Sequence, residues 1–213
     1  MPDLFVITGP NGAGKSSNAY ILTSKPTGFP VFDGDKLFYQ LLDEHYKVTK
    51  VAKYAREMAE EELQNIFAKQ VSKAILENQD YAYEGHFSSE SSWTTIKQFR
   101  EAGYSVNMIF LALENVVLSL QRVAVRVSQG GHYVPPAHIY ENYFGNIKSL
   151  DQNLKLIDKL TIIDNSSINA KHILTLENRK ITYIARDPMP AWIQNNMAEL
   201  LKIIERDNAR RPL

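Results

Sequence analysis

Cysteine is absent from this chain of 213 residues, and so is any long apolar run. Without cysteine, disulfides and thiolate chemistry are excluded, including the ligation of a metal by thiolates. The strongest apolar run, at residues 108–113, is far shorter than the roughly 20 residues that a membrane-spanning helix requires. The first seven residues contain no basic cluster of the kind that begins a secretory signal peptide. These absences predict a cytoplasmic protein with no membrane partner.

Neither sign of charge predominates. Lys and Arg together number 24, as do Asp and Glu, so the formal net charge is zero. The chain therefore lacks an overall positive field for nucleic acid, and we expect no nucleic acid partner. The five histidines show no metal-ligand spacing. The length suits one α/β domain spanning residues 1–213, because it is short for two domains and no linker of biased composition divides it.

A glycine-rich segment, residues 9–16, follows the apolar run at residues 4–7 and has the pattern G-x-x-x-x-G-K-S. Its three glycines lack a Cβ, so the backbone can adopt positive φ and its amides can approach a phosphate closely. Lys15 supplies a cation for the β- and γ-phosphates, and the Ser16 hydroxyl is the predicted Mg²⁺ ligand. A glycine-rich turn with an unrelated lysine is the weaker interpretation, because an apolar strand precedes the segment and a helix is expected after it. The predicted ATP-binding residues of this segment are Gly9, Pro10, Asn11, Gly12, Ala13, Gly14, Lys15, Ser16 and Ser17.

The pattern of apolar residues predicts strands that alternate with helices. Strands are expected at residues 4–7, 29–32, 81–87, 106–113 and 160–163, and a hairpin at residues 173–185. Helices are expected at residues 17–22, 52–76, 93–102, 116–127 and 139–156, and a last one after Pro190. Short apolar strands separated by helices favour a five-stranded parallel sheet covered on both faces, which is a three-layer α/β/α fold. The C-terminal hairpin and helix complete it.

Acidic and polar residues follow several of the predicted strands. They are Asp33 and Asp35 after the second strand, Glu84 and His86 after the third, and Asn165 and Ser166 after the fifth. In a parallel sheet, the carboxyl ends of the strands share one edge, and ligands bind there. We therefore expect these residues to lie near the glycine-rich segment.

Two interpretations stay open for most of these residues. Asp35 either takes a proton from an acceptor hydroxyl or caps the helix that begins near Lys36. Asp33 supports the turn or a metal-bound water. Glu84 binds an acceptor hydroxyl or is held by a neighbouring amide, with His86 beside it. Asn165 borders an adenine or makes local hydrogen bonds in a turn.

Arg122 and Arg126 lie four residues apart on one predicted helix, just before a loop at residues 130–136 that begins with two glycines. Such a pair often forms a solvated helix face. Phosphoryl transfer, however, needs cations around the transferred group, and the planar guanidinium suits its oxygens. The segment therefore resembles a lid that closes over ATP and excludes water.

Taken together, these motifs resemble the zeta toxin family of P-loop phosphotransferases, in the branch described as predicted ATPases. The matching segments are residues 9–17, D-G-D at 33–35, Y-E-G-H at 83–86, R-V-A-V-R-V at 122–127, G-G-H-Y-V-P at 130–135 and D-N-S at 164–166. They cover about the first 166 residues in the family's order. The glycine-rich segment is shared by many NTPases, whereas the last three motifs are far more selective.

The resemblance implies a P-loop NTPase, kinase-like fold and gives roles to several residues. Asp35 corresponds to the catalytic base, Glu84 to an acid of the substrate pocket, and Arg122 to an arginine that contacts the transferred phosphate. His132 stands near the place of a second phosphate arginine, with Arg126 as its substitute. The family often has E-T or E-G-T where this chain has Glu84-Gly85-His86, which points to a different acceptor pocket.

Our hypothesis from the sequence is an ATP- and Mg²⁺-dependent kinase that phosphorylates a hydroxyl of a small molecule. The best-studied family members act on a UDP-activated amino sugar and are restrained by an antitoxin, so these are the candidate acceptor and protein partner. The alternatives are an ATPase or nucleotide-gated interaction protein without a metabolite acceptor, and a housekeeping kinase with another substrate. The predicted catalytic residues are Lys15, Asp35, Arg122 and Arg126; the substrate-binding residues are Asp33, Glu84 and His86; His132 and Asn165 complete the ATP site; and Ser16 is the metal ligand.

Overall fold

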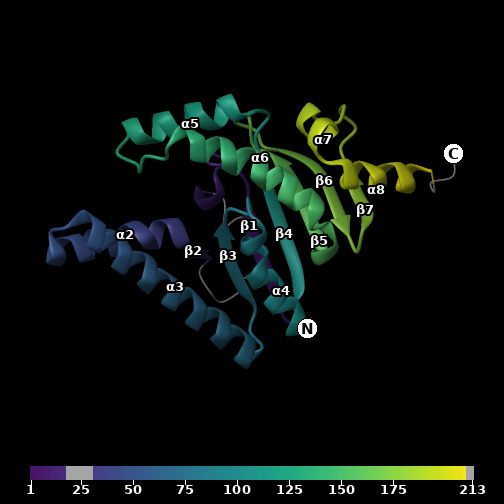
Figure 1. The fold of residues 1–213 in the computed structure, drawn as a ribbon. Coiled ribbons are helices and arrows are strands. Elements are labelled where there is room, and N and C mark those ends of the chain that lie inside the picture. The colour runs from purple at the N-terminus through teal and green to yellow at the C-terminus, as the bar shows by residue number, and fades with distance from the viewer. Residues whose placement is uncertain (18–30, 210–213) are drawn as a thin grey trace.

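The computed structural model describes residues 1–17 and 31–209 and contains a mixed sheet, which in these residues has seven strands in the order β2-β3-β1-β4-β5-β6-β7 (Figure 1). Five strands run parallel: β1 (Asp3–Thr8), β2 (Phe32–Asp33), β3 (Tyr81–Gly85), β4 (Ser105–Ala112) and β5 (Lys159–Asp164). The antiparallel hairpin of β6 (Lys171–Glu177) and β7 (Lys180–Ile184) extends the same sheet beyond β5. The predicted parallel sheet and hairpin are therefore confirmed, and the hairpin is part of the sheet.

The helices also follow the predicted order. Their bounds are α2 (Gly34–Thr49), α3 (Ala52–Glu77), α4 (Thr94–Glu101), α5 (Val116–Ser128), α6 (Pro136–Gln152), α7 (Ala191–Asn196) and α8 (Ala198–Asn208), with 3₁₀ turns at Glu90–Trp93 and Leu154–Leu156. The single helix expected after Pro190 is wrong. Met197, with φ −125° and ψ 68°, leaves the helical conformation and divides it into α7 and α8.

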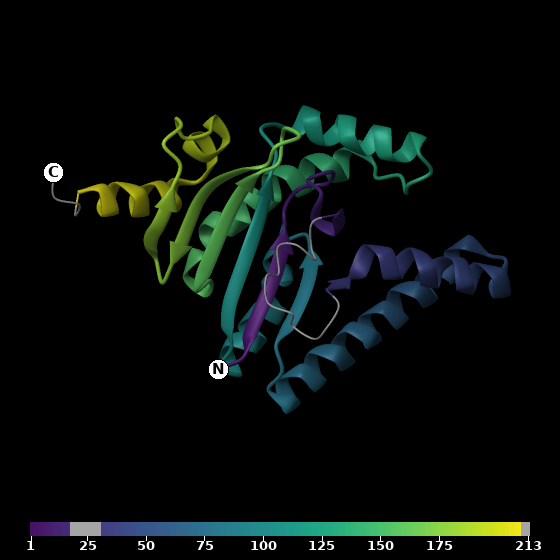
Figure 2. The ribbon, with the colours of Figure 1, turned by 180° about the vertical axis from the view of Figure 1, so that it is seen from behind.

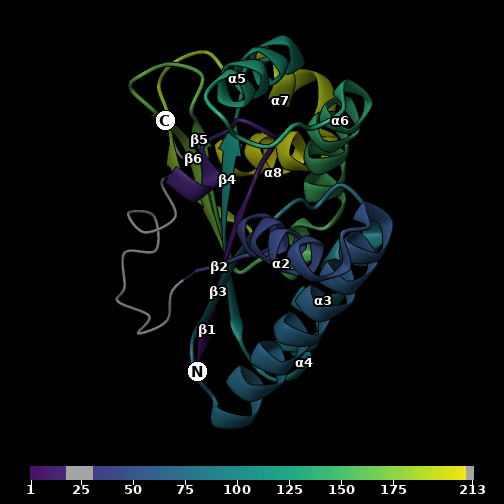
Figure 3. The same ribbon diagram turned by 90° about the vertical axis from the view of Figure 1, so that its left-hand side faces the viewer.

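The sheet carries α4, α6, α7 and α8 on one face (Figures 2 and 3). In Figure 2, the strands lie nearest to the viewer and α4 and α6 lie behind them. The helix expected at residues 17–22 falls outside the described residues except for Ser17, and residues 15–17 are helical. Coverage of the second face therefore stays a prediction. Within residues 1–17 and 31–209, no helix combines the length and the apolar character needed to cross a membrane.

The core lies between the sheet and this helical layer. Alternate residues of β4 are buried, as the pleat of a half-covered strand requires, and its last residues are buried without interruption. Aromatic side chains join β3 to its helices: Tyr81 stacks on Phe99 of α4, and Phe67 of α3 contacts Tyr83 edge-on. This packing fixes the end of β3, and with it Glu84, against β1.

Helices α2 and α3 form a helical hairpin that extends outward beside β2 and β3 (Figure 1). The turn between them is short because Lys50 adopts a left-handed conformation, with φ 56°, directly after α2. The hairpin begins at the carboxyl end of β2. It therefore forms one wall of the space above the edge of the sheet where the strands end.

Candidate active site

The glycine-rich segment connects β1 to a helix that begins at Lys15. Gly9, Gly12 and Gly14 all have positive φ, at 144°, 73° and 83°. A Cβ on Gly9 would lie 2.1 Å from the carbonyl oxygen of Leu111 in β4, so no other residue fits there. The loop geometry expected from the pattern is therefore present.

Side chains from three other parts of the chain hold this loop in shape. Ser119 Oγ of α5 donates to the carbonyl of Asn11 at 2.6 Å, and Asn142 Nδ2 of α6 donates to Asn11 Oδ1 at 2.9 Å. Asn165 Nδ2 donates to the carbonyl of Ala13 at 2.8 Å. Asn165, predicted at the ATP site, thus lies against the loop and supports its backbone.

Lys15 is buried at the centre of the site. Its Nζ donates to the carbonyls of Gly9 at 3.1 Å and Pro10 at 3.3 Å. Burial lowers the pKa of the ammonium, and the carboxylates of Glu84 and Asp35 oppose this shift. A buried ammonium beside an anion-binding loop is a strong attractor for phosphate.

The exposed residue Ser16 is hydrogen-bonded to the buried Glu84. Ser16 Oγ donates to Glu84 Oε1 at 2.6 Å, whereas Glu84 Oε2 is buried and finds no hydrogen-bond partner in the described part of the chain. Burial raises the pKa of Glu84 to about 7, against the opposing effect of the Ser16 hydroxyl and with a further rise from Asp33. The predicted alternative of Glu84 held by an amide is replaced by this hydroxyl contact.

A neutral side chain at position 84 is expected to remove a pH-dependent loss of stability. Because the folded pKa of Glu84 is raised, the native state binds more protons than the unfolded state between pH 4.5 and 7, so stability falls as pH rises through that window. Without nucleotide or Mg²⁺, Glu84→Gln should avoid about 1–2 kcal/mol of this loss, after allowance for screening by solvent. Urea denaturation at pH 5 and pH 8 measures it. The control is Glu61→Gln, at an exposed position of α3. If the free energy of unfolding changes equally between pH 5 and pH 8 in wild type and in Glu84→Gln, the raised pKa of Glu84 is contradicted.

The two aspartates after β2 have different positions. Asp33 is the N-cap of α2, where its Oδ1 accepts from the backbone N–H of Lys36 at 2.9 Å. Asp35 lies in the first turn of α2, is exposed, and is close enough to Lys15 to raise its pKa. The cap considered for Asp35 is therefore made by Asp33, and the Asp35 carboxylate faces the site.

His86 contacts the glycine-rich loop. Its Nε2 lies 3.3 Å from Asn11 Nδ2, and because Asn11 Oδ1 already accepts from Asn142, the Asn11 amide donates to the ring. Burial and the nearby Lys15 keep the pKa of His86 well below its ordinary value. His86 is thus a neutral ring that joins the end of β3 to the loop.

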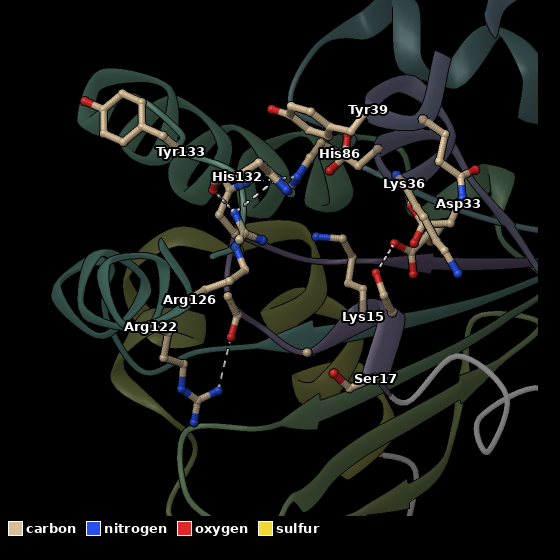
Figure 4. A pocket seen from close by; sticks show the side chains of 18 of the residues that line it. Lys15, Ser17, Asp33, Lys36, Tyr39, His86, Arg122, Arg126, His132 and Tyr133 are labelled. Carbon is tan, nitrogen blue, oxygen red and sulfur yellow. Dashed lines mark hydrogen bonds between the residues drawn. The ribbon is translucent and has the colours of Figure 1, made fainter. Parts of the chain in front are cut away.

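The two arginines of α5 point to different places (Figure 4). Arg122 donates to the carbonyls of Gly12 at 3.2 Å and Ser166 at 2.9 Å. Arg126 extends toward Lys15 and lies near enough to lower its pKa. Its Nη2 contacts His132 Nε2 at 3.1 Å and the His132 carbonyl at 3.3 Å. His132 and Arg126, considered as substitutes for one another, act here as a pair.

The model of the zeta toxin family matches residues 1–173 of the chain. The chain belongs to this family. Membership makes it one of the ATP-using P-loop kinases, which are phosphotransferases, as the sequence motifs predicted. A search of the curated proteins gave no significant match.

Solved structures agree with the kinase fold of this zeta toxin family member. One belongs to the PezAT chromosomal toxin–antitoxin system of Streptococcus pneumoniae, with 16% identity, a TM-score of 0.56, and coverage of 99% of this chain and 86% of that chain. Another is the AvrRxo1-ORF1:-ORF2 structure with ATP, with 13% identity, a TM-score of 0.59, and coverage of 100% of this chain and 65% of that chain. A putative kinase from Chloroflexus aurantiacus has 16% identity, a TM-score of 0.50, and coverage of 67% of this chain and 75% of that chain. At such identities the likeness concerns the fold alone.

Two neighbouring cavities, which share several lining residues, lie above the sheet in this zeta toxin family member. The larger, of about 1190 Å³, extends from the glycine-rich loop to α2, α5 and the loop at residues 130–133. The smaller, of about 340 Å³, lies between the end of β3 and the helices α2 and α3. Lys15, Asp35 and Glu84 border both cavities. Most of the site residues inferred from the sequence therefore line the larger cavity, while Asn165 contacts the backbone of the loop.

Sequence reasoning missed Tyr39 of α2 and Arg56 of α3. Tyr39 lines the larger cavity and stacks on His132, with ring centroids 4.3 Å apart. Arg56 borders both cavities, where its guanidinium lies over the Phe38 ring and pairs with Glu60. No motif marks either residue, because their place in the site comes from the packing of the α2–α3 hairpin.

Proposed function

We propose that the chain is an ATP- and Mg²⁺-dependent kinase that transfers the γ-phosphoryl group to a hydroxyl of a small molecule in the smaller cavity. The observation that carries this proposal is that Lys15 and Asp35 each border both cavities. A cation for the phosphates and a carboxylate for the acceptor then stand on either side of the reacting atoms, as phosphoryl transfer requires.

ATP binds in the larger cavity with its phosphates on the glycine-rich loop. Backbone amides of that loop and Lys15 Nζ hold the β- and γ-phosphates, so Lys15 exchanges the loop carbonyls for phosphate oxygens. Arg126 meets the transferred group, because it is the arginine of α5 that extends toward Lys15 (Figure 4). Arg122 and Asn165 hold the loop backbone from the side of β5. His132 contributes to ATP binding indirectly, because it accepts hydrogen bonds from Arg126 and so positions the guanidinium.

The acceptor hydroxyl attacks the γ-phosphorus on the side away from the leaving group. A new P–O bond forms to the acceptor oxygen, the bond between the γ-phosphorus and the bridging oxygen breaks, and ADP leaves with that electron pair. Asp35 takes the proton of the acceptor hydroxyl. Glu84 and His86 shape the end of β3 where the acceptor binds, and Asp33 fixes the first turn of α2 that carries Asp35.

Ser16 and Glu84 fit a hard cation. Ser16 Oγ and Glu84 Oε1 are hydrogen-bonded, and the buried Glu84 Oε2 lacks a hydrogen-bond partner in the described residues. Residues 1–17 and 31–209 contain no cluster of three His, Cys, Asp or Glu side chains suited to a metal. This agrees with Mg²⁺, which is usually held by one or two protein oxygens, substrate phosphates and water. Mg²⁺ held there would neutralise negative charge on the phosphates of ATP.

A UDP-activated amino sugar is our candidate acceptor, because the best-studied zeta toxins use one. We place the reaction in the cytoplasm, where ATP and such sugars occur. The smaller cavity favours this kinase over an ATPase or nucleotide-gated interaction protein, since water as acceptor needs no cavity of about 340 Å³. The PezAT relative belongs to a toxin–antitoxin system, which supports an antitoxin as the partner of this chain as well.

The test is transfer of labelled phosphate from γ-labelled ATP to UDP-N-acetylglucosamine, followed by the same assay with a fractionated metabolite extract. We expect a phosphorylated product that depends on Mg²⁺ and an acceptor. ATP turnover that is unchanged by any acceptor would instead support the ATPase. Growth arrest on induction, absent with a Lys15 variant, would distinguish a toxin from a housekeeping kinase.

A further inference from the structure

The loop after α5 folds back onto the arginine that precedes it. Gly130 has φ 87°, and the N–H of Gly131 donates to the carbonyl of Arg126 at 2.9 Å. A Cβ on Gly131 would lie 2.6 Å from Arg126 Cγ, so a glycine is needed for this close approach. The fold of the loop therefore brings His132 against the guanidinium of Arg126.

His132 holds this guanidinium at two points. Arg126 Nη2 approaches both the ring Nε2, at 3.1 Å, and the carbonyl oxygen, at 3.3 Å. Since Arg126 can only donate, Nε2 of His132 accepts and the ring is neutral. Arg126 Nε is buried and has no hydrogen-bond partner within residues 1–17 and 31–209, so the two contacts to His132 are made by Nη2 alone.

Tyr39 of α2 reaches the same histidine from the opposite wall of the larger cavity. The two rings are stacked, with centroids 4.3 Å apart and planes inclined by 25°. Tyr39 lies one helical turn after Asp35 on α2, so the contact joins the helix of the proposed base to the loop of the phosphate arginine (Figure 4). Tyr133, the next residue of the loop, points away from this contact.

We propose that Tyr39 and His132 form a latch that closes the larger cavity over ATP and holds Arg126 at the transferred phosphate. The two are positioning residues that act through Arg126. With the latch closed, the wall of α5 and the wall of α2 are joined above the phosphates, which slows release of the nucleotide and limits entry of water. This inference rests on the proposed function for the part that concerns transfer, while its effect on nucleotide release is independent of any acceptor.

The first experiment measures release of a fluorescent ATP analogue, mant-ATP, by stopped flow. Tyr39→Leu removes the ring and is expected to speed release about three- to tenfold, the range corresponding to one aromatic pair. Tyr39→Phe keeps the ring and should recover most of the wild-type value. The matched control is Tyr46→Leu, an exposed tyrosine of the same helix that lines neither cavity. Release from Tyr39→Leu at the wild-type rate would overturn the latch.

The second experiment asks whether Tyr39 acts through Arg126. For transfer to the acceptor found in the assay above, Tyr39→Leu and His132→Ala should each lower kcat about three- to tenfold with little change in KM for the acceptor. In an Arg126→Ala background, neither substitution should lower kcat further. Additive losses would mean a general structural effect and would overturn the positioning role.

The two proposals can fail separately. If no acceptor is ever phosphorylated but Tyr39→Leu speeds mant-ATP release and Tyr39→Phe does not, the kinase assignment falls and the latch stands. If transfer occurs and Tyr39→Leu and His132→Ala match the wild type in mant-ATP release and in kcat, the latch is rejected and the kinase assignment stands. Thermal unfolding of each variant confirms that the fold is retained, as expected for a tyrosine that is 36% exposed.

Discussion

Asp35→Asn is expected to lower the rate of phosphoryl transfer about 10²–10⁴-fold, the usual contribution of a general base. Asparagine has nearly the same shape and can still accept a hydrogen bond from the acceptor hydroxyl, but it cannot take up the proton. Asp35 is exposed and is not the cap of α2, so neither folding nor the loop that holds ATP depends on it. Affinity for Mg·ATP should therefore stay within about threefold of wild type, a difference below 1 kcal/mol.

Two measurements check this expectation. Transfer from γ-labelled ATP gives the rate, and calorimetry gives the affinity for Mg·ATP. Glu44→Gln, at an exposed position of the same helix outside both cavities, is the control and should transfer phosphate normally. If Asp35→Asn transfers phosphate as fast as this control, Asp35 is not the base.

Lys15→Met is expected to lower transfer about 10²–10³-fold, because it removes a buried positive charge from the place where negative charge develops. The same change should abolish most of the thermal stabilisation that Mg·ATP gives the wild type. Without nucleotide the variant should be at least as stable as wild type, since the ammonium is buried at the expense of its hydration and its pKa is lowered accordingly.

Differential scanning fluorimetry with and without Mg·ATP separates these effects. Lys53→Met on the exposed face of α3 provides the control for loss of a positive charge, because Lys53 borders neither cavity. A Lys15→Met protein that keeps the full nucleotide-induced shift in Tm would contradict the role of Lys15. A Lys15→Met protein that is less stable than wild type in the absence of nucleotide would contradict the expectation that the substitution does not destabilise the nucleotide-free protein.

The parts of the fold that could be predicted are those with a strong local signal. β4 was predicted as a strand at residues 106–113 because that run is almost wholly apolar, and the structure has it at Ser105–Ala112. The break at Met197 could not be predicted, because methionine is a good helix former and the packing of α7 and α8 decides the conformation there. Likewise β2 is only Phe32–Asp33, later than the predicted 29–32, of which residues 29 and 30 lie outside the described chain.

The site divides in the same way. The conformation of the glycine-rich loop is specified within a few residues, so its geometry followed from the pattern alone. That Asp33 and not Asp35 caps α2 could not be foreseen, because both residues can cap a helix and only the start of α2 at Gly34 decides which one does. The pairing of Arg126 with His132 depends on the backward fold of the loop, and the stacking of Tyr39 on His132 depends on a helix about 90 positions earlier.

The smaller cavity has a consequence for how this enzyme could diverge. Four residues of its wall come from the α2–α3 hairpin, namely Phe38, Arg56, Glu60 and Leu63. The glycine-rich loop is supported instead from α5, α6 and the segment after β5. Under the proposed function, substitutions at these four positions would alter which molecule is modified and would leave the support of the glycine-rich loop unchanged.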